Sequence, residues 1–320
     1  MDLQLYLENI ELSRAQHRFT AYPIKQFPAL LFAKRGLIYD SAIMAASLQY
    51  LKKASKAFSP FRLLAAPIIT AQMSLSLDGV QAINDAERAY AYGKSVDYPT
   101  LIAASAAPFA AWDIAMHAHG HDMYLAVDRA RRFYSYVKSK HSVLASSLDA
   151  YVSCWVALSS IDLQAGSEFA ERSYKIIRSQ GSGNNMAELA LSELVLISGL
   201  EDGPDLISDM RRLLFGRKAF AKRESAAAWG TAALFANNVS QAADIITEIY
   251  YSLKRQRDFR FVTDGHTLSI ASLIYCIGAE DGTYPRNARF PSQVAYSLLS
   301  AVQGCVITHM VQQVNSSSSG

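Results

Sequence analysis

The sequence has few of the features that indicate a disulfide-stabilised or exported protein. Its 320 residues include only three cysteines, Cys154, Cys276 and Cys305, which are far apart and lie in apolar stretches. Such cysteines fit buried, reduced thiols better than a disulfide framework. The first residues also lack a basic region followed by an apolar run. We therefore expect a cytoplasmic protein.

An excess of charge of one sign is also missing. Lys and Arg total 31 and Asp and Glu 28, a net charge of +3, and 51% of the residues are hydrophobic. This balance gives no reason to expect a nucleic acid or a membrane as partner. The most apolar run, 101–116, contains Pro108 and Asp113 and is shorter than the roughly 20 residues that span a bilayer. We expect a large buried core and no contact with a membrane.

Sequence motifs of catalysis and nucleotide binding are missing as well. The chain has no GxSxG, HExxH, CxxC or GxxxxGK[ST] motif. Acidic pairs such as Glu201-Asp202 and Glu280-Asp281 lie beside glycine and fit solvated turns. We therefore predict no catalytic residues and no cofactor, and we favour a role other than an enzyme.

What the sequence does contain is a repeat. An aromatic residue or leucine stands four residues before a cation in five segments that recur every 37–44 residues: Tyr90 with Lys94, Tyr134 with Lys138, Tyr174 with Arg178, Leu213 with Arg217, and Tyr250 with Lys254. Between them lie apolar, alanine-rich segments at about 60–76, 101–116, 143–159, 186–197, 225–235 and 267–277. This period is typical of stacked helix pairs.

The repeat predicts the fold class and the domain organisation. Period-two alternation, which indicates strands, is essentially missing. We predict an all-α fold of antiparallel helix-pair repeats, an α-solenoid or α-α superhelix, with about six or seven pairs in a single domain over residues 1–313. A flexible serine-rich tail, 314–320, should follow. Pro67 and Pro108 interrupt helical runs at similar places, where we expect kinks, and Ser59 should cap a helix that begins with Pro60.

The last predicted helix, 291–313, is apolar for a chain end. It carries a stripe of Val294, Leu298, Leu299, Val302, Val306 and Met310. Such a stripe is normally core. We expect it either to cap the array or to pair with a second copy of the chain.

Several scattered segments are similar to a known family. They are residues 59–62 (Ser-Pro-Phe-Arg), 130–134 (Ala-Arg-Arg-Phe-Tyr), 182–184 (Ser-Gly-Asn) and the final apolar helix that runs into 315–320. Together they resemble DUF4003, a bacterial domain of unknown function, over nearly the whole chain. The resemblance implies an all-helical, cytoplasmic protein of Gram-positive-type bacteria, and it implies no catalytic residues.

One cluster suggests metal chemistry. His117, His119, His121 and Asp122 are all residue types that bind zinc. The cluster falls in the turn between two predicted helices, however, where Asp122 can serve as an N-cap, and no second ligand motif accompanies it. We favour a polar surface turn and keep a metal-dependent enzyme as an alternative.

The four Tyr-to-cation pairs define a second candidate site, the Tyr-cation ladder: Tyr90, Lys94, Tyr134, Lys138, Tyr174, Arg178, Tyr250 and Lys254. On an exposed face it could bind an acidic peptide or stack on single-stranded nucleic acid. Alternatively, the tyrosines pack between helices and the cations lie at helix ends in water. We favour this packing interpretation.

Basic residues also gather near the anchored helices, in three groups: Arg129, Arg131, Arg132, Lys138 and Lys140; Arg211, Arg212, Arg217, Lys218, Lys222 and Arg223; and Lys254, Arg255, Arg257 and Arg260. Interleaved acids, among them Glu87 and Glu171, weaken this basic ridge as a nucleic-acid site. Our leading hypothesis is therefore a non-enzymatic scaffold that binds a protein or peptide, with nucleic-acid binding as a second alternative.

Overall fold

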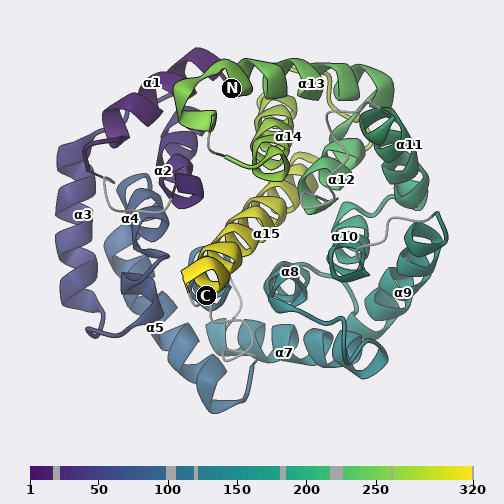
Figure 1. Cartoon of the computed structure of the whole chain (residues 1–320). Helices are drawn as coiled ribbons and strands as arrows, with labels where there is room; N and C mark the ends of the chain where they lie inside the picture. The colour runs from purple at the N-terminus through teal and green to yellow at the C-terminus, as the bar shows by residue number, and fades with distance from the viewer. Residues whose placement is uncertain are drawn as a thin grey trace. The chain divides into compact units, whose positions relative to one another are not determined.

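A computed structural model describes residues 1–16, 22–98, 106–118, 122–180, 185–216, 226–260 and 262–318. Over these ranges the protein is all-α, with fifteen α-helices, two 3-10 helices and no strand (Figure 1). The only β-type pairing in the described part is an isolated bridge between Ala236 and Arg286. The predicted fold class, all-α, is confirmed.

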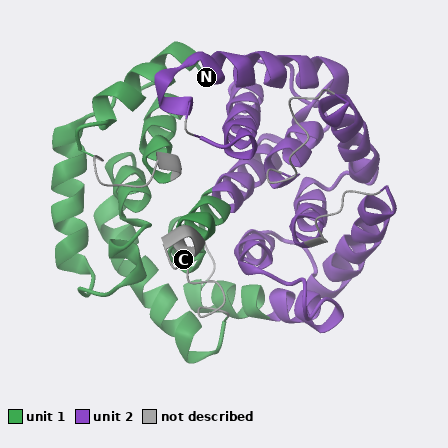
Figure 2. Cartoon of the chain, viewed as in Figure 1, with its two compact units in different colours: residues 1–131, 307–320 green, residues 132–306 purple. Residues whose placement is uncertain are grey.

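The chain divides into two compact units (Figure 2). Unit 1 comprises residues 1–131 and 307–320, and unit 2 comprises residues 132–306. We describe each unit by itself. The single repeat domain over 1–313 stays a prediction.

Unit 1 consists of helix pairs. Its elements are α1 (Leu3–Ser13), α2 (Tyr22–Lys34), α3 (Ser41–Ala54), η1 (Pro60–Arg62), α4 (Ala66–Ser74), α5 (Gly79–Ser95), α6 (Ala107–His117) and the first half of α7 (Met123–Lys140). Within it α1 packs on α2, α3 on α4 and α5 on α6, while α2 also contacts α4 and α3 contacts α5. Each pair therefore stacks on the next.

Unit 2 repeats this arrangement in two rows. Its elements are the second half of α7, then α8 (Ser147–Leu158), α9 (Leu163–Ser179), α10 (Asn185–Ser198), α11 (Gly203–Phe215), α12 (Ala226–Phe235), α13 (Val239–Arg255), η3 (Arg257–Phe259), α14 (Asp264–Glu280) and the first part of α15 (Ser292–Ser318). Helices α8, α10, α12 and α14 contact one another in sequence, and α9, α11 and α13 form an outer row against them (Figure 1).

The composition of the two rows explains their places. Every residue of α12 is buried, α8 buries all but its last residue, and α14 buries all but its first and last, because alanine, serine and leucine let helices approach on all sides. The outer helices bury only one face each. Since their other face is polar, they separate the inner row from water.

The prolines in the apolar helices start helices rather than kinking them. Pro67 and Pro108 lie in the first turns of α4 and α6. At this position the missing backbone N–H costs nothing, because the first turn has no intrahelical acceptor for it. The predicted kinks are therefore wrong. Ser59 precedes only the 3-10 turn η1 and makes no side-chain cap; its hydroxyl donates to Glu87 instead, at 2.7 Å.

Helix α15 extends to Ser318, beyond the end predicted at Gln313. Most of its apolar stripe is covered inside the protein: Leu298, Leu299, Val302, Val306 and Met310 are each at most 4% exposed, while Val294 is half-buried. Among the described residues, one stretch, Ser292–Val314, has the length and hydropathy of a membrane-crossing helix, and 72% of that window is buried. A core helix of a folded domain meets the same criteria.

Candidate functional site

The tyrosines of the Tyr-cation ladder lie mainly in the core. Tyr134, Tyr174 and Tyr250 are 3%, 2% and 4% exposed. Tyr90 is half-buried and meets the ring of Phe61 edge-on, with centroids 5.9 Å apart. The rings of the three buried tyrosines therefore cannot stack on a base or a peptide, and the structure favours the packing interpretation.

The cations of the ladder point the other way. Lys94, Lys138 and Arg178 are exposed. Lys254 is half-buried, and its Nζ lies 2.9 Å from the carboxylate of Asp264 and donates to the carbonyl of Val262. Three of the four cations are therefore available to a partner at the surface.

Two successive outer helices of unit 2 meet through a histidine and a glutamate. His141, just after the end of α7, places its Nε2 2.6 Å from Oε2 of Glu171 on α9. Its ring packs edge-on against Tyr174, with centroids 4.7 Å apart, and Lys175 lies 3.3 Å from the same carboxylate. These polar partners hold the pKa of Glu171 below its usual value even though burial opposes them.

The repeat supplies the acid of this contact. Glu87 stands three residues before Tyr90, as Glu171 does before Tyr174. Each accepts a hydrogen bond from a residue that follows an earlier helix: Ser59 after α3, and His141 after α7. From the sequence alone both acids count only as charges that weaken a basic ridge. Their shared place in the repeat was the signal that could have identified them as links between repeats.

Exposed cations and apolar side chains lie on α7, on α9 and just after α7, in the segments that contribute His141 and Glu171; we call them the junction surface: Lys138, Tyr136, Lys140, Val143, Lys175, Ile176 and Arg178. Tyr136, Val143 and Ile176 are 41%, 88% and 43% exposed, and the four cations are exposed. All seven residues belong to unit 2, on or next to α7 and α9 (Figure 1). Exposed apolar groups beside one sign of charge favour contact with a protein that carries apolar and acidic groups.

The interior of unit 2 holds two carboxyl groups that sequence reasoning missed. Asp149 on α8 and Glu193 on α10 are both 0% exposed. Oδ2 of Asp149 accepts from the backbone N–H and the hydroxyl of Ser146, at 2.6 and 2.7 Å, in the capping box of α8. Oδ1 of Asp149 and both carboxyl oxygens of Glu193 have no hydrogen-bond partner among the described residues.

Burial governs the protonation of this pair. It raises the pKa of Asp149 to about 7, against the hydrogen bonds from Ser146, which lower it. It also raises the pKa of Glu193 well above its usual value, and the charge of Asp149 adds to this effect. Burial raises the pKa of Tyr134 on α7 to about 12, and the charges of Asp149 and Glu193 add to this effect. Burial and the same two charges also raise the pKa of the Cys305 thiol on α15. The two carboxyl groups on α8 and α10 thus act electrostatically on each other's surroundings and on groups of two further helices, α7 and α15.

Helix α15 crosses α8 beside these groups. The ring of Tyr151 occupies the space where a Cβ on Gly304 would lie. The hydroxyl of Tyr151 accepts from Trp155 Nε1 at 3.0 Å and donates to the carbonyl of Ser300 at 3.3 Å. Only glycine at position 304 allows this close approach.

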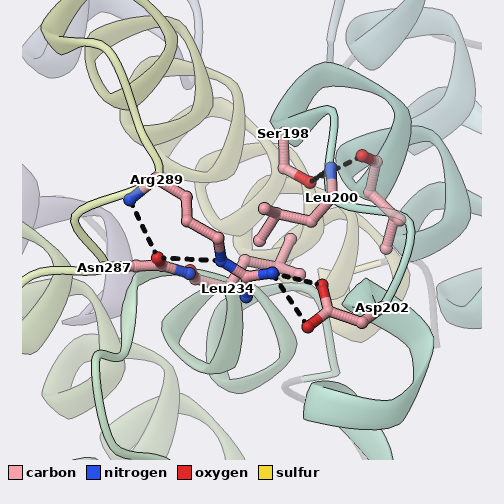
Figure 3. A network of polar contacts seen from close by, with 7 residues as sticks. Ser198, Leu200, Asp202, Leu234, Asn287 and Arg289 are labelled. Carbon is pink, nitrogen blue, oxygen red and sulfur yellow. Dashed lines mark hydrogen bonds and ion pairs between the residues drawn. The ribbon is translucent and has the colours of Figure 1, made fainter.

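The connection that leads into α15 is fixed by its own polar contacts (Figure 3). The backbone N–H of Asn287 donates to the carbonyl of Phe235 at 2.8 Å, and its side-chain amide donates to that of Leu234 at 3.3 Å. Arg289 reaches both carboxylate oxygens of Asp202, each at 2.9 Å. The connection therefore binds to the end of α12 and the start of α11.

The histidine cluster is only partly described. His119 and His121 lie outside the described residues, and His117 ends α6. The carboxylate of Asp122 accepts the backbone N–H of Tyr124 at 2.8 Å, so its predicted N-cap role at the start of α7 is confirmed. In the part of the chain that the structure describes, no group of three or more His, Cys, Asp or Glu residues is placed to hold a metal ion.

Comparison with known protein families gives a match over most of the chain. The family described as "Protein of unknown function (DUF4003)" matches residues 11–302. The chain belongs to the DUF4003 family. No curated protein and no solved structure matches it. The junction surface and the buried carboxyl pair of this DUF4003 chain both lie inside the matched range.

Proposed function

We propose that this DUF4003 protein is a non-enzymatic scaffold that binds a partner protein through the junction surface. The observation that carries the proposal is the combination of four exposed cations with three exposed apolar side chains in the segments that form one contact between outer helices. The partner segment should carry acidic and apolar residues.

The helix pairs supply the frame for this surface. Within each unit, pairs stack on their neighbours, which supports an α-solenoid in which stability is shared between adjacent repeats. Because the inner row fills the core, the exposed faces of the outer helices remain for binding. The bond from His141 to Glu171 fixes the end of α7 against α9. The surface is therefore preorganised, and little conformational freedom is lost on binding.

Nucleic acid is the competing partner for such cations. The exposed rings that would stack on bases are few here, because Tyr134 and Tyr174 are buried. An acidic protein segment with apolar anchors therefore fits better.

Charge reversal tests the proposal. Wild type, the double variant Lys138→Glu/Arg178→Glu and the control Arg212→Glu are immobilised and exposed to a nuclease-treated lysate of the source cells. Arg212 is exposed on α11, is not part of the junction surface, and pairs with Asp209 on its own helix. We expect wild type and the control to retain the same protein and the double variant to lose at least tenfold of it. Equal capture by all three proteins would contradict the proposal. Capture that occurs only in a lysate without nuclease treatment would also contradict it.

A further inference from the structure

We infer that Asp149 and Glu193 form a buried proton-binding site in unit 2, and that loss of a proton from this site releases the first part of α15, residues 292–306, from α8. The ligand of this site is the proton itself. The inference is independent of the junction surface, because none of its residues belongs to that surface.

The oxygen atoms of the pair carry the first part of the argument. Asp149 Oδ1 and both Glu193 carboxyl oxygens are buried without a hydrogen-bond partner in the described structure. The hydroxyl of Tyr134, a residue that is 3% exposed, is likewise without a partner there. An ionised carboxylate that leaves water needs a cation or several donors in compensation. A proton on each carboxyl group meets this need, because the two protons remove both charges and supply donors to the oxygens.

No compensating cation acts on the pair from the described elements around it. The titratable groups that feel its charge are Tyr134 on α7 and Cys305 on α15, both neutral at physiological pH. Glu188, one turn earlier on α10, acts instead on Tyr174. Two carboxyl groups that interact in this way lose their protons one after the other, as a pair.

Helix α15 is the element that such a charge would displace. The charges of both carboxyl groups act on the Cys305 thiol, and the neighbouring Gly304 has only a hydrogen atom against the ring of Tyr151. A new charge on the pair must recruit water, and because Tyr151 of α8 packs closely on Gly304 of α15, water can enter here only if α15 moves away from α8. Burial holds the pKa of Asp149 near 7, so this change falls in the neutral range.

Thiol labelling tests the inference in the full-length protein. Cys305 and Cys276 are both buried in unit 2, but Cys276 lies on α14 and is not coupled to the pair. Both are labelled with N-ethylmaleimide from pH 5 to 8, and mass spectrometry gives the ratio of their labelling rates. The ratio cancels the intrinsic pH dependence of thiols, and global unfolding exposes both equally.

We expect the ratio of Cys305 to Cys276 labelling to rise about tenfold for each pH unit between 5 and 7 in wild type, because opening releases one proton. The variant Asp149→Asn/Glu193→Gln should show a flat ratio, while Glu168→Gln, which neutralises an exposed carboxylate on α9, should behave as wild type. A flat ratio in wild type, or the same rise in the double variant, would overturn the inference.

An infrared measurement on the wild type needs no substitution. At pH 6 the spectrum should contain the carbonyl band of a protonated, buried carboxylic acid, and this band should weaken as the pH passes 7. If the double variant does not fold, this band decides the question: its absence at pH 6 would overturn the proton-binding site, and its pH-dependent loss supports it.

Discussion

Replacing Gly304 with alanine tests how α15 is held against α8. In most helix interiors this substitution stabilises a protein by about 1 kcal/mol, because alanine is the better helix former. At position 304 the new methyl group would overlap the ring carbons and hydroxyl of Tyr151, which is 1% exposed and has no space to move into. The usual gain should therefore become a loss.

The structure gives the size of this loss. Overpacking a filled core costs about 1–3 kcal/mol. Displacing the Tyr151 hydroxyl also removes the acceptor of the Trp155 indole N–H and the bond to the Ser300 carbonyl, each worth about 1 kcal/mol. Against a gain of about 1 kcal/mol from helix propensity, we expect a net destabilisation of about 2–4 kcal/mol.

Urea unfolding followed by circular dichroism measures this effect. Gly93→Ala on α5 is the matched control, because a Cβ there would meet Tyr98 and Val127 at ordinary distances of 3.5–3.7 Å. The control should be neutral or more stable than wild type. In a Tyr151→Leu background, Gly304→Ala should cost clearly less, as a double-mutant cycle will show. A Gly304→Ala protein as stable as wild type would refute the reasoning.

Three further predictions concern unit 2. Asp149 keeps its proton up to about pH 7 in the folded protein and up to about pH 4 in the unfolded chain, so its contribution to stability is complete below about pH 4 and is lost as the pH rises to about 7. Asp149→Asn should remove this dependence of the free energy of unfolding on pH, and at pH 8 it should stabilise the protein by up to about 4 kcal/mol in urea titrations. An unchanged pH dependence would contradict the assignment. Asn287→Ala should lower the free energy of unfolding by about 1–3 kcal/mol, because it leaves the buried carbonyl of Leu234 without its side-chain donor. Arg289→Ala should lower it by less than about 1 kcal/mol, because the ion pair with Asp202 is half exposed. The reverse order would refute this ranking. Tyr134→Ala should lower the free energy of unfolding by about 3–5 kcal/mol and Lys138→Ala by less than about 0.5 kcal/mol, and equal effects would contradict their opposite burial.

The fold class could be predicted from the sequence because it depends on local signals. The missing period-two alternation and the recurring Tyr-to-cation pairs both point to helices, and the apolar segment predicted at 225–235 is α12, Ala226–Phe235. The kinks expected at Pro67 and Pro108 could not be judged from the sequence, because it does not say whether a proline stands inside a helix or in its first turn. That depends on where the preceding segment packs.

The candidate sites depended on contacts that local patterns do not contain. Asp149 looks like an ordinary helix-start residue, and only packing against α10 and α15 turns it into half of a buried pair. A signal for the other half was present: Glu193 is one of two acids, with Glu188, in the apolar run 186–197. His141 carried no such signal, since its partner Glu171 lies thirty residues away.

Photo-crosslinking tests the central claim of a partner-binding junction surface most directly. A benzophenone side chain is placed at Tyr136 or Ile176 of the junction surface, and at Tyr251, a similarly exposed residue on α13, as the control. Irradiation of the native cells should give the same protein adduct from both junction positions and none from the control, and Lys138→Glu/Arg178→Glu should abolish it. No adduct from the junction, an equal adduct from Tyr251, or an adduct with nucleic acid would contradict the account.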